Sequence, residues 1–349
     1  MKNQEKIFVI GHKNPDTDSI CSAIAYCDIK NRTTQESRYI PKRAGQINEE
    51  TEYVLNRFGV HPPGYLSNIG TQVKDMDIRL SPEANKSMSL KNAWDLMQEN
   101  SIVSLPIREK DGTLEGLITI GDIAKTYMDT TDSYLLSRAR TQYQRIAETI
   151  GGKVIEGNAH GYFIQGKIMV ATANPDKMKE YVEENDMVIM GNREEDHLQA
   201  IEQNVSCIIV GMGIEVTEKV LKLAHEKDIV IISSPYDTFT ISRLINQSIP
   251  VKYIMKTDNL VTFNTEDFTD DIQEVMIKHR HRAFPVINKK GKCIGTISRR
   301  NFLDMHRKKV VLVDHNEKDQ AVDNIDKADI MEIIDHHKLG TQIGRASCR

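Results

Sequence analysis

Histidine and carboxylate side chains gather in three short segments of this chain. The first, Gly11–Ser19, reads Gly-His-Lys-Asn-Pro-Asp-Thr-Asp-Ser, the second centres on Asp314, and the third is Asp335–His337. Imidazoles mixed with carboxylates favour Mn²⁺ or a similar transition metal over Mg²⁺ alone, and a carboxylate between two such cations can bridge them. Two divalent cations about 3.5–4 Å apart suit hydrolysis at phosphorus, because they lower the pKa of a bridging water and stabilise the attacking and leaving oxygens. The three segments therefore predict a two-metal hydrolytic centre.

Each segment follows a short apolar run that predicts a buried β-strand. The runs are Ile7–Ile10, Val310–Val313 and Ile333–Ile334. After the first run, residues 20–29 carry apolar side chains at helical spacing, so we expect a strand, a loop and a helix that open an α/β unit. Asp18 or Ser19 has an alternative role there as the cap of that helix. Because ligands bind at the C-terminal edge of parallel strands, the sequence predicts one sheet that gathers all three segments across a long insertion.

The insertion contains an internal repeat. Each copy has a helix, a strand with a proline, a turn, a second strand and a hydroxyl-bearing helix start, which predicts a β-α-β-β-α unit. The copies comprise Ala93–Met97, Ser104–Ile107 and Gly116–Asp122, and again Asp271–Lys278, Ala283–Ile287 and Gly295–Asn301.

The segment between the copies, Thr130–Gln247, has its own α/β pattern. We expect a helix around Tyr134–Ile150 and a separate small α/β domain. Its strands are predicted at Met187–Met190, Cys207–Val210 and Ile229–Ile232, with an amphipathic stretch at Thr217–Glu226.

Composition excludes several classes of protein. With 349 residues, of which 39% are apolar, the chain is long enough for two or three folded domains. Lys and Arg number 46 against 50 Asp and Glu, so no excess of positive charge indicates a nucleic-acid or membrane partner. No apolar run predicts a membrane span or a signal peptide, and five cysteines without a CxxC pair argue against a disulfide framework. We expect a cytoplasmic protein.

The metal-binding motifs resemble a known family. His-x-Asn-Pro-Asp-x-Asp-Ser, Val-Asp-His-Asn-Glu and Asp-His-His-Lys-Leu-Gly are similar to motifs of the DHH phosphoesterase superfamily, and within it to family II, manganese-dependent inorganic pyrophosphatases. Pro41–Thr51 also resembles the second strand and following helix of that family. The resemblance implies hydrolysis of diphosphate to two orthophosphates with two Mn²⁺ per site, Co²⁺ or Mg²⁺ being alternatives.

The resemblance also implies a role for each residue of the centre. His12 and Asp16 would hold one metal, Asp18 and His336 the other, and Asp314 would bridge the two.

Two further residues receive catalytic roles from the same resemblance. His337 would contact the substrate, and Asp335 would orient a ligand histidine without binding the metal itself. We expect a structural role for His315 and a solvated position for Lys338.

The repeated units resemble CBS domains, which bind adenine nucleotides. Their pattern Gly-h-x-Ser/Thr-x-x-Asp/Asn implies contacts to phosphate and ribose, and the free N–H groups of a helix start suit a phosphate. Capping of the helices by the same residues is the alternative. The expected ligands are AMP and ADP as inhibitors and ATP or a diadenosine polyphosphate as activators, bound by a homodimer. The contact residues would be Thr119, Asp122, Ser298, Arg299 and Asn301.

The fold class expected is α/β, with a DHH-type parallel sheet domain interrupted by two CBS domains that flank a small α/β domain similar to DRTGG domains. Gly191–Glu195 departs from the letters of that name. The expected domains are residues 1–68 (DHH, first part), 69–129 (CBS 1), 130–247 (DRTGG-like), 248–307 (CBS 2), 308–342 (DHH, continued and truncated) and 343–349 (a non-native tail).

The family resemblance predicts more chain than is present. Family II pyrophosphatases continue after Asp-His-His with another metal-binding Asp and a C-terminal substrate-binding domain, so we hypothesise a truncated gene model. Two other functions stay open: a DHH phosphodiesterase acting on oligonucleotides or cyclic dinucleotides, and a catalytically inactive adenine-nucleotide sensor.

Overall fold

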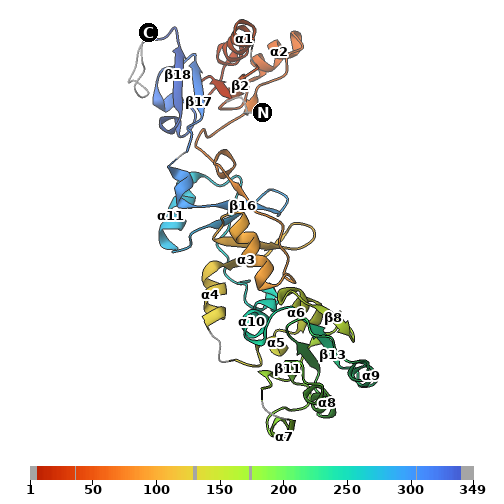
Figure 1. Cartoon of the computed structure of the whole chain (residues 1–349). Coiled ribbons are helices and arrows are strands. Elements are labelled where there is room, and N and C mark those ends of the chain that lie inside the picture. The colour runs from red at the N-terminus through yellow and green to blue at the C-terminus, as the bar shows by residue number, and fades with distance from the viewer. Residues whose placement is uncertain (1–5, 36, 129–131, 173–174, 304, 339–349) are drawn as a thin grey trace. The chain divides into compact units, whose positions relative to one another are not determined.

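The computed structural model describes residues 6–35, 37–128, 132–172, 175–303 and 305–338 (Figure 1). Its contacts divide the chain into two compact units. Unit 1 comprises Met1–Ile78, Phe263–His281 and Ile297–Arg349, and unit 2 comprises Arg79–Thr262 and Arg282–Thr296. None of the helices in the described part of the chain has the length and hydrophobicity that a membrane span requires.

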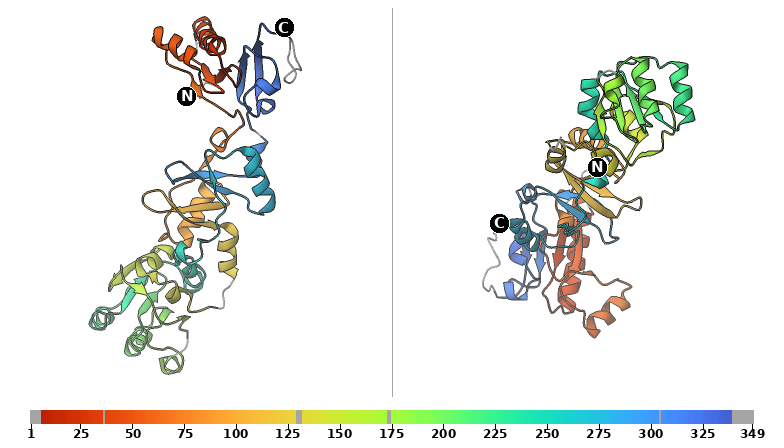
Figure 2. Two further views of the ribbon diagram at one scale, coloured as in Figure 1. Left: turned by 180° about the vertical axis from the view of Figure 1, so that it is seen from behind. Right: turned by 90° about the horizontal axis from the view of Figure 1, so that it is seen from below.

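Unit 1 contains a five-stranded parallel sheet that joins the two ends of the chain, as predicted (Figure 2). The run Val310–Val313 in the middle of this sheet is continuously apolar and almost fully buried, because hydrophobic side chains pack on both faces of the sheet. The strand order is β18-β17-β1-β2-β3, so the segments that follow β1, β17 and β18 emerge at one edge. The strands are β1 (Ile7–Ile10), β2 (Tyr39–Arg43), β3 (Gly64–Tyr65), β17 (Lys309–Val313) and β18 (Asp329–Ile334).

Two helices accompany this sheet, α1 (Thr17–Thr34) and α2 (Glu49–Arg57). The first is longer than the predicted stretch 20–29 and begins with a different cap. The Asp16 carboxylate accepts the backbone N–H of Ser19 at 2.9 Å, so Asp16 caps α1, and the alternative role of Asp18 or Ser19 as the cap is wrong. Residues 16–19, Asp-Thr-Asp-Ser, are four consecutive polar residues of types that can cap a helix, and the loop geometry selects the first.

The two repeat copies have the predicted order of elements, with one difference. Copy one contains β4 (Arg79–Leu80), α3 (Leu90–Glu99), β5 (Ser104–Arg108), β6 (Leu114–Thr119) and α4 (Ile120–Met128). Copy two contains β14 (Phe263–Asn264), α11 (Thr269–Lys278), β15 (Phe284–Ile287) and β16 (Cys293–Ile297). The helix predicted to follow Ser298 is a 3₁₀ turn at Arg299–Phe302, because the chain re-enters the sheet of unit 1 as β17 shortly afterwards.

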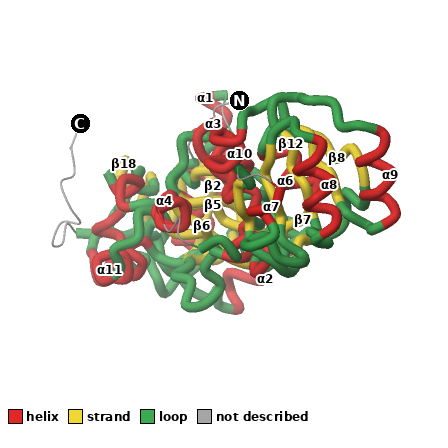
Figure 3. Tube along the Cα trace, turned by 60° about the horizontal axis from the view of Figure 1, so that its bottom comes forward, coloured by secondary structure: helices red, strands yellow, loops and turns green. Residues whose placement is uncertain are grey.

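Unit 2 also contains the sheet of the middle segment, in the order β10-β11-β12-β13-β8. Figure 3 labels two of its strands, β8 and β12, in yellow. Four strands are parallel and β8 pairs antiparallel with β13. The strands are β8 (Lys153–Glu156), β10 (Ile168–Val170), β11 (Met187–Met190), β12 (Cys207–Val210) and β13 (Val230–Ser233). The helices α7 (Pro175–Met178), α8 (Glu194–Glu202), α9 (Glu218–Glu226) and α10 (Thr238–Leu244) follow or connect them.

The single helix predicted around Tyr134–Ile150 is wrong. The structure has α5 (Leu135–Arg138), β7 (Thr141–Gln142) and α6 (Tyr143–Thr149) instead. Arg140 adopts a left-handed φ of 51°, which ends α5, and β7 then pairs with β9 (Tyr162–Phe163). Apolar spacing continues through this break, so the periodicity alone could not reveal it.

Candidate metal centre

The loop after β1 packs tightly against the start of α1, and this contact places His12. A Cβ built on Gly11 would lie 1.8 Å from Ser19 Oγ, so the backbone approaches the helix at a distance that a side chain would prevent. Ser19 Oγ accepts the backbone N–H of His12 at 3.1 Å. Ser19 itself is fully buried. The result is a fixed direction for the His12 ring toward the edge of the sheet.

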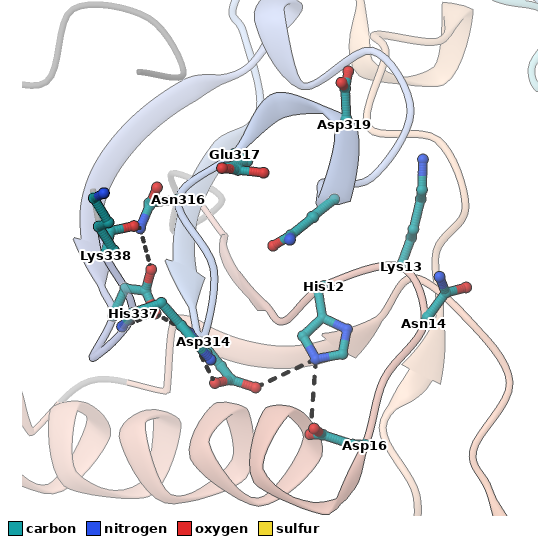
Figure 4. Close-up of a pocket in the computed structure, with 12 residues that line it drawn as sticks. His12, Lys13, Asn14, Asp16, Asp314, Asn316, Glu317, Asp319, His337 and Lys338 are labelled. Carbon is teal, nitrogen blue, oxygen red and sulfur yellow. Dashed lines mark hydrogen bonds and ion pairs between the residues drawn. The ribbon is translucent and has the colours of Figure 1, made fainter. Parts of the chain in front are cut away.

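His12, Asp16 and Asp314 form one group of potential metal ligands (Figure 4). His12 Nε2 lies 3.7 Å from Asp16 Oδ1 and 3.4 Å from Asp314 Oδ2. Separations of this size between donor atoms leave room for a cation that all three contact. The predicted ligands of the first metal thus lie together, one from the loop, one from the cap of α1 and one from the end of β17.

A second group of potential metal ligands, Asp314, His336 and His337, lies on the other side of Asp314. His336 Nε2 lies 3.2 Å from Asp314 Oδ1 and 3.6 Å from Asp18 Oδ2. The two oxygens of Asp314 therefore face different neighbours, Oδ2 toward His12 and Oδ1 toward His336. A carboxylate in this arrangement can donate one oxygen to each of two cations.

The backbone at Asp314 has an uncommon conformation. Its φ is 61°, in the left-handed region that costs a non-glycine residue about 1–2 kcal/mol. The N–H of Asp314 donates to the carbonyl of Ile334 at 2.9 Å, which ties this turn to the end of β18. Its side chain is 4% exposed, so the surrounding sheet holds the carboxylate in place. Strained residues of this kind concentrate at functional sites.

His337, whose Nδ1 lies 3.8 Å from Asp314 Oδ1 in the second group, is also hydrogen-bonded to Asp335. Asp335 Oδ1 accepts the backbone N–H of His337 at 3.1 Å and the ring Nδ1–H at 2.7 Å. The carboxylate hydrogen bond raises the pKa of His337 above its ordinary value. Burial raises the pKa of Asp335, but hydrogen bonds from His337 and Asn316 outweigh it and the net direction is downward. Asp335 was expected to orient a ligand histidine; in this structure its carboxylate bonds to Asn316 and to His337, which follows β18 in the same tight turn.

His315 lies outside both ligand groups. Its ring is buried, its Nδ1–H donates to the carbonyl of Val313 at 2.9 Å, and burial lowers its pKa. The Nε2 atom is buried and has no hydrogen-bond partner among the described residues. The ring meets that of His12 edge to face, with 6.4 Å between centroids, so it supports His12 by packing.

His12, Asp16, Asp314, Asp335 and His337 line a cavity of about 470 Å³ at the sheet edge, whereas Asp18 and His336 lie outside its lining. Four charged side chains that the sequence reasoning left aside or treated as solvated also line it: Lys13, Glu317, Asp319 and Lys338. Lys13 is held at the rim by its backbone N–H, which donates to the carbonyl of Gln320 at 2.7 Å. The sequence could have indicated these four residues, because each is within five positions of a predicted metal ligand.

The donor set fits Mn²⁺ or Co²⁺. Two imidazoles and three carboxylates come from four different loops and helix starts, and nitrogen mixed with oxygen suits these ions better than Mg²⁺. Three carboxylates held together also require positive charge to offset their mutual repulsion. The residues present therefore match a centre of two divalent transition-metal ions.

The predicted nucleotide contacts bond to one another in both copies of the repeat. In unit 2, Thr119 Oγ1 donates to Asp122 Oδ2 at 2.6 Å, and Lys256 lies 3.6 Å from the other Asp122 oxygen. In unit 1, Ser298 Oγ donates to Asn301 Oδ1 at 2.9 Å. Each pair caps the first turn of the element that follows it, as the alternative to nucleotide binding expects. The contact of these residues with a nucleotide stays a prediction.

Arg299, the remaining predicted nucleotide contact, points its guanidinium to the end of α11. It donates to the carbonyls of Met276, His279 and His281. The bonds to Met276 and His279 satisfy carbonyls that the C-terminus of α11 leaves free, so in this structure the side chain caps that helix.

Comparison with known proteins identifies two kinds of domain in the chain. The model for the CBS domain matches residues 77–129 and 251–308, and the model for the DRTGG domain matches residues 145–248. A solved structure of the CBS and DRTGG domains of the regulatory region of Clostridium perfringens pyrophosphatase, complexed with the activator diadenosine tetraphosphate, is similar with a TM-score of 0.62 and 34% identity. The similarity covers 66% of this chain and 100% of that one.

Two curated relatives match along almost the whole chain. The cobalt-dependent inorganic pyrophosphatase of Clostridium perfringens is 38% identical over 337 residues, which is 96% of this chain and 61% of the relative. The probable manganese-dependent inorganic pyrophosphatase of Thermotoga maritima is 32% identical over 340 residues, 97% of this chain and 62% of the relative. The chain thus spans somewhat under two thirds of the length of these proteins.

Proposed function

We propose that this protein hydrolyses inorganic diphosphate to two orthophosphates. The premise is that the chain belongs to the metal-dependent inorganic pyrophosphatases with CBS and DRTGG domains. The observation that carries the proposal is the placement of Asp314, whose two oxygens face His12 and His336 in separate ligand groups. A diphosphate has two charged phosphoryl groups, and a pair of cations that share one carboxylate could bind their oxygens and the attacking water.

Mn²⁺ or Co²⁺ is the proposed cofactor, with two ions per site. His12 and Asp16 would hold one ion, Asp18 and His336 the other, and Asp314 would contact both. When bound, the ions lower the pKa of a shared water and neutralise charge on the phosphoryl oxygens. The protein contributes the fixed directions of its donors, which come from the tight loop at Gly11 and the strained turn at Asp314.

His337 is the proposed contact to the substrate. The Asp335 carboxylate holds its Nδ1–H and raises its pKa, so the ring keeps a proton for a phosphate oxygen to higher pH than an ordinary histidine. The ring is 57% exposed and lines the cavity, where a ligand can reach it. Lys13 and Lys338 line the same cavity and would add positive charge beside a bound anion.

Adenine nucleotides are the proposed regulators, bound by the two CBS domains. The relative from Clostridium perfringens holds diadenosine tetraphosphate in its CBS and DRTGG region, which supports this class of ligand. Thr119, Asp122, Ser298 and Asn301 would meet phosphate and ribose, exchanging their mutual hydrogen bonds for bonds to the nucleotide. AMP and ADP as inhibitors, ATP or a diadenosine polyphosphate as activators, and a homodimer as the binding form belong to the same proposal.

The domain limits given by the sequence remain proposals as well. They place the DHH domain at residues 1–68 and 308–342, with the CBS, DRTGG-like and second CBS domains at residues 69–129, 130–247 and 248–307. A cytoplasmic location is likewise a prediction from composition.

Phosphate release from diphosphate tests the proposal. The chain is purified, stripped of metal, reloaded with Mn²⁺, Co²⁺ or Mg²⁺ and compared with Asp314→Asn. We expect release with Mn²⁺ or Co²⁺, and a loss of about two orders of magnitude or more in the variant, because the bridging charge is gone. Asp323→Asn is the matched control, since Asp323 lies exposed in the same loop region after β17, away from the ligand groups.

Other outcomes would replace the proposal. Metal binding without phosphate release from diphosphate, together with AMP binding by calorimetry, would favour the inactive sensor. Release from short oligonucleotides or cyclic dinucleotides with none from diphosphate would favour the phosphodiesterase.

A further inference from the structure

Three amide side chains line the cavity, Asn14, Asn316 and Gln320, and the proposed reaction gives none of them a role; the Asn316 amide joins two of the segments that carry the site. Asn316 follows Asp314 by two residues, is 6% exposed and lines the cavity. Its Nδ2 donates to Asp335 Oδ2 and to the backbone carbonyl of Lys338, the latter at 3.2 Å. The amide thus joins the segment after β17 to the segment after β18, where the Asp-His-His motif lies.

The Asp335 carboxylate divides its two oxygens between two partners. Oδ1 accepts both N–H groups of His337, and Oδ2 accepts the Asn316 amide. The Asp335 side chain is 5% exposed, so water has little access to replace a lost partner. A buried carboxylate oxygen without a hydrogen bond is costly, and the group would rotate to recover one. Such a rotation would release the ring of His337, because Oδ1 holds its Nδ1–H.

We propose that Asn316 is a positioning residue that acts through Asp335 to fix the direction of the His337 ring in the cavity. This inference rests on the proposed function, which gives His337 its contact to a phosphate group of the substrate. The Lys338 carbonyl bond has the same effect from the other side of His337, because it anchors the residue that follows the ring. The segment is therefore held on both sides of His337 by one amide.

Histidine-ring NMR of the metal-free chain tests this link without any reaction. Long-range ¹H–¹⁵N spectra at one fixed pH report the hydrogen bonding of each ring nitrogen, and the signal lost in His337→Gln identifies His337. We expect a carboxylate-bonded Nδ1–H for His337 in the natural chain. In Asn316→Ala we expect the His337 signals to move toward those of the exposed His61. Asp335→Asn, which alters the same link from the other end, should move them in the same direction.

Asn31→Ala is the matched control for this experiment. Asn31 also makes two hydrogen bonds through its amide, to the backbone of Tyr39 at 2.9 and 3.0 Å, but it lies near the far end of α1. This variant should leave the His337 signals in place. The proposal is overturned when His337 is unchanged in Asn316→Ala, when Asn31→Ala moves it equally, or when the natural chain has no carboxylate-bonded Nδ1–H at His337. If Asn316→Ala does not fold, Asn316→Leu takes its place, because leucine keeps the size of the side chain but has no N–H to donate to Asp335.

Hydrolysis assays on the same variants separate the two proposals. Asn316→Ala should lower diphosphate hydrolysis roughly tenfold, the lower end of the range for outer partners of metal sites, with the affinity for Mn²⁺ unchanged. If the natural chain hydrolyses no diphosphate, the proposed function fails, and the NMR comparison still decides the role of Asn316.

Discussion

Gly11→Ala should damage the metal centre through a packing clash. The new Cβ would lie 1.8 Å from Ser19 Oγ and 3.0 Å from Ser19 Cβ and the Ser19 carbonyl, so the loop and the helix start must separate by more than 1 Å. Overpacking of this kind costs about 1–3 kcal/mol, and the strained His12 to Ser19 hydrogen bond adds about 1 kcal/mol. We therefore expect a loss of about 2–4 kcal/mol in the free energy of unfolding of the sheet domain.

Denaturant unfolding of the metal-free chain measures this loss, and a second substitution tests its cause. Ser19→Ala removes the oxygen that the new Cβ meets, so Gly11→Ala should cost less in that background than in the natural one. Gly64→Ala is the matched control in the same sheet, because its nearest neighbour is the flexible end of Lys42 at 3.0 Å. Equal costs in both backgrounds, or a neutral Gly11→Ala, would refute the reasoning from the close approach. Calorimetry with Mn²⁺ should show weaker binding in Gly11→Ala and unchanged binding in Gly64→Ala.

Three more changes test other parts of the centre. Asp16→Ser should keep the cap of α1 yet weaken Mn²⁺ binding, whereas Asp16→Ala should also lose about 1 kcal/mol of stability; unfolding and titration calorimetry separate the two. Glu332 accepts hydrogen bonds from Tyr26 and Lys30; burial alone would raise its pKa, but these bonds give a net shift below the ordinary 4.5. A carboxyl group whose pKa is lowered by folding stabilises the fold above pH 4.5, and this contribution is lost as the pH falls. In urea unfolding, the free energy of unfolding of the natural chain should therefore decline below pH 4.5, and Glu332→Gln should lack that part of the decline. The difference should be under about 1 kcal/mol, because the Glu332 side chain is 41% exposed. Chelation of the metal should lower the midpoint of thermal unfolding, since saturation at a hundred times Kd contributes about 2.7 kcal/mol.

The sequence predicted those parts of the fold that local patterns determine. Val310–Val313 is apolar without alternation, as a strand buried on both faces must be, and the carboxylate after it falls at the sheet edge. The break at Arg140 could not be predicted, because arginine is not a residue type that signals a left-handed turn and the apolar spacing runs on beyond it. The task of Asn316 was equally invisible, since it depends on the distance between two loops that are far apart in the chain.

The order of the strands explains which carboxylate faces both ligand groups. β17 lies between β1 and β18, so the residue at its end has His12 on one side and His336 on the other. Carboxylates on α1 each reach one side: Asp16 faces His12, and Asp18 faces His336. The left-handed turn at Asp314 completes the arrangement, because a strand continuing in extended geometry would direct alternate side chains to the two faces of the sheet and not beyond its edge. A change that restores extended geometry at this position would therefore remove the bridge even where the carboxylate is kept.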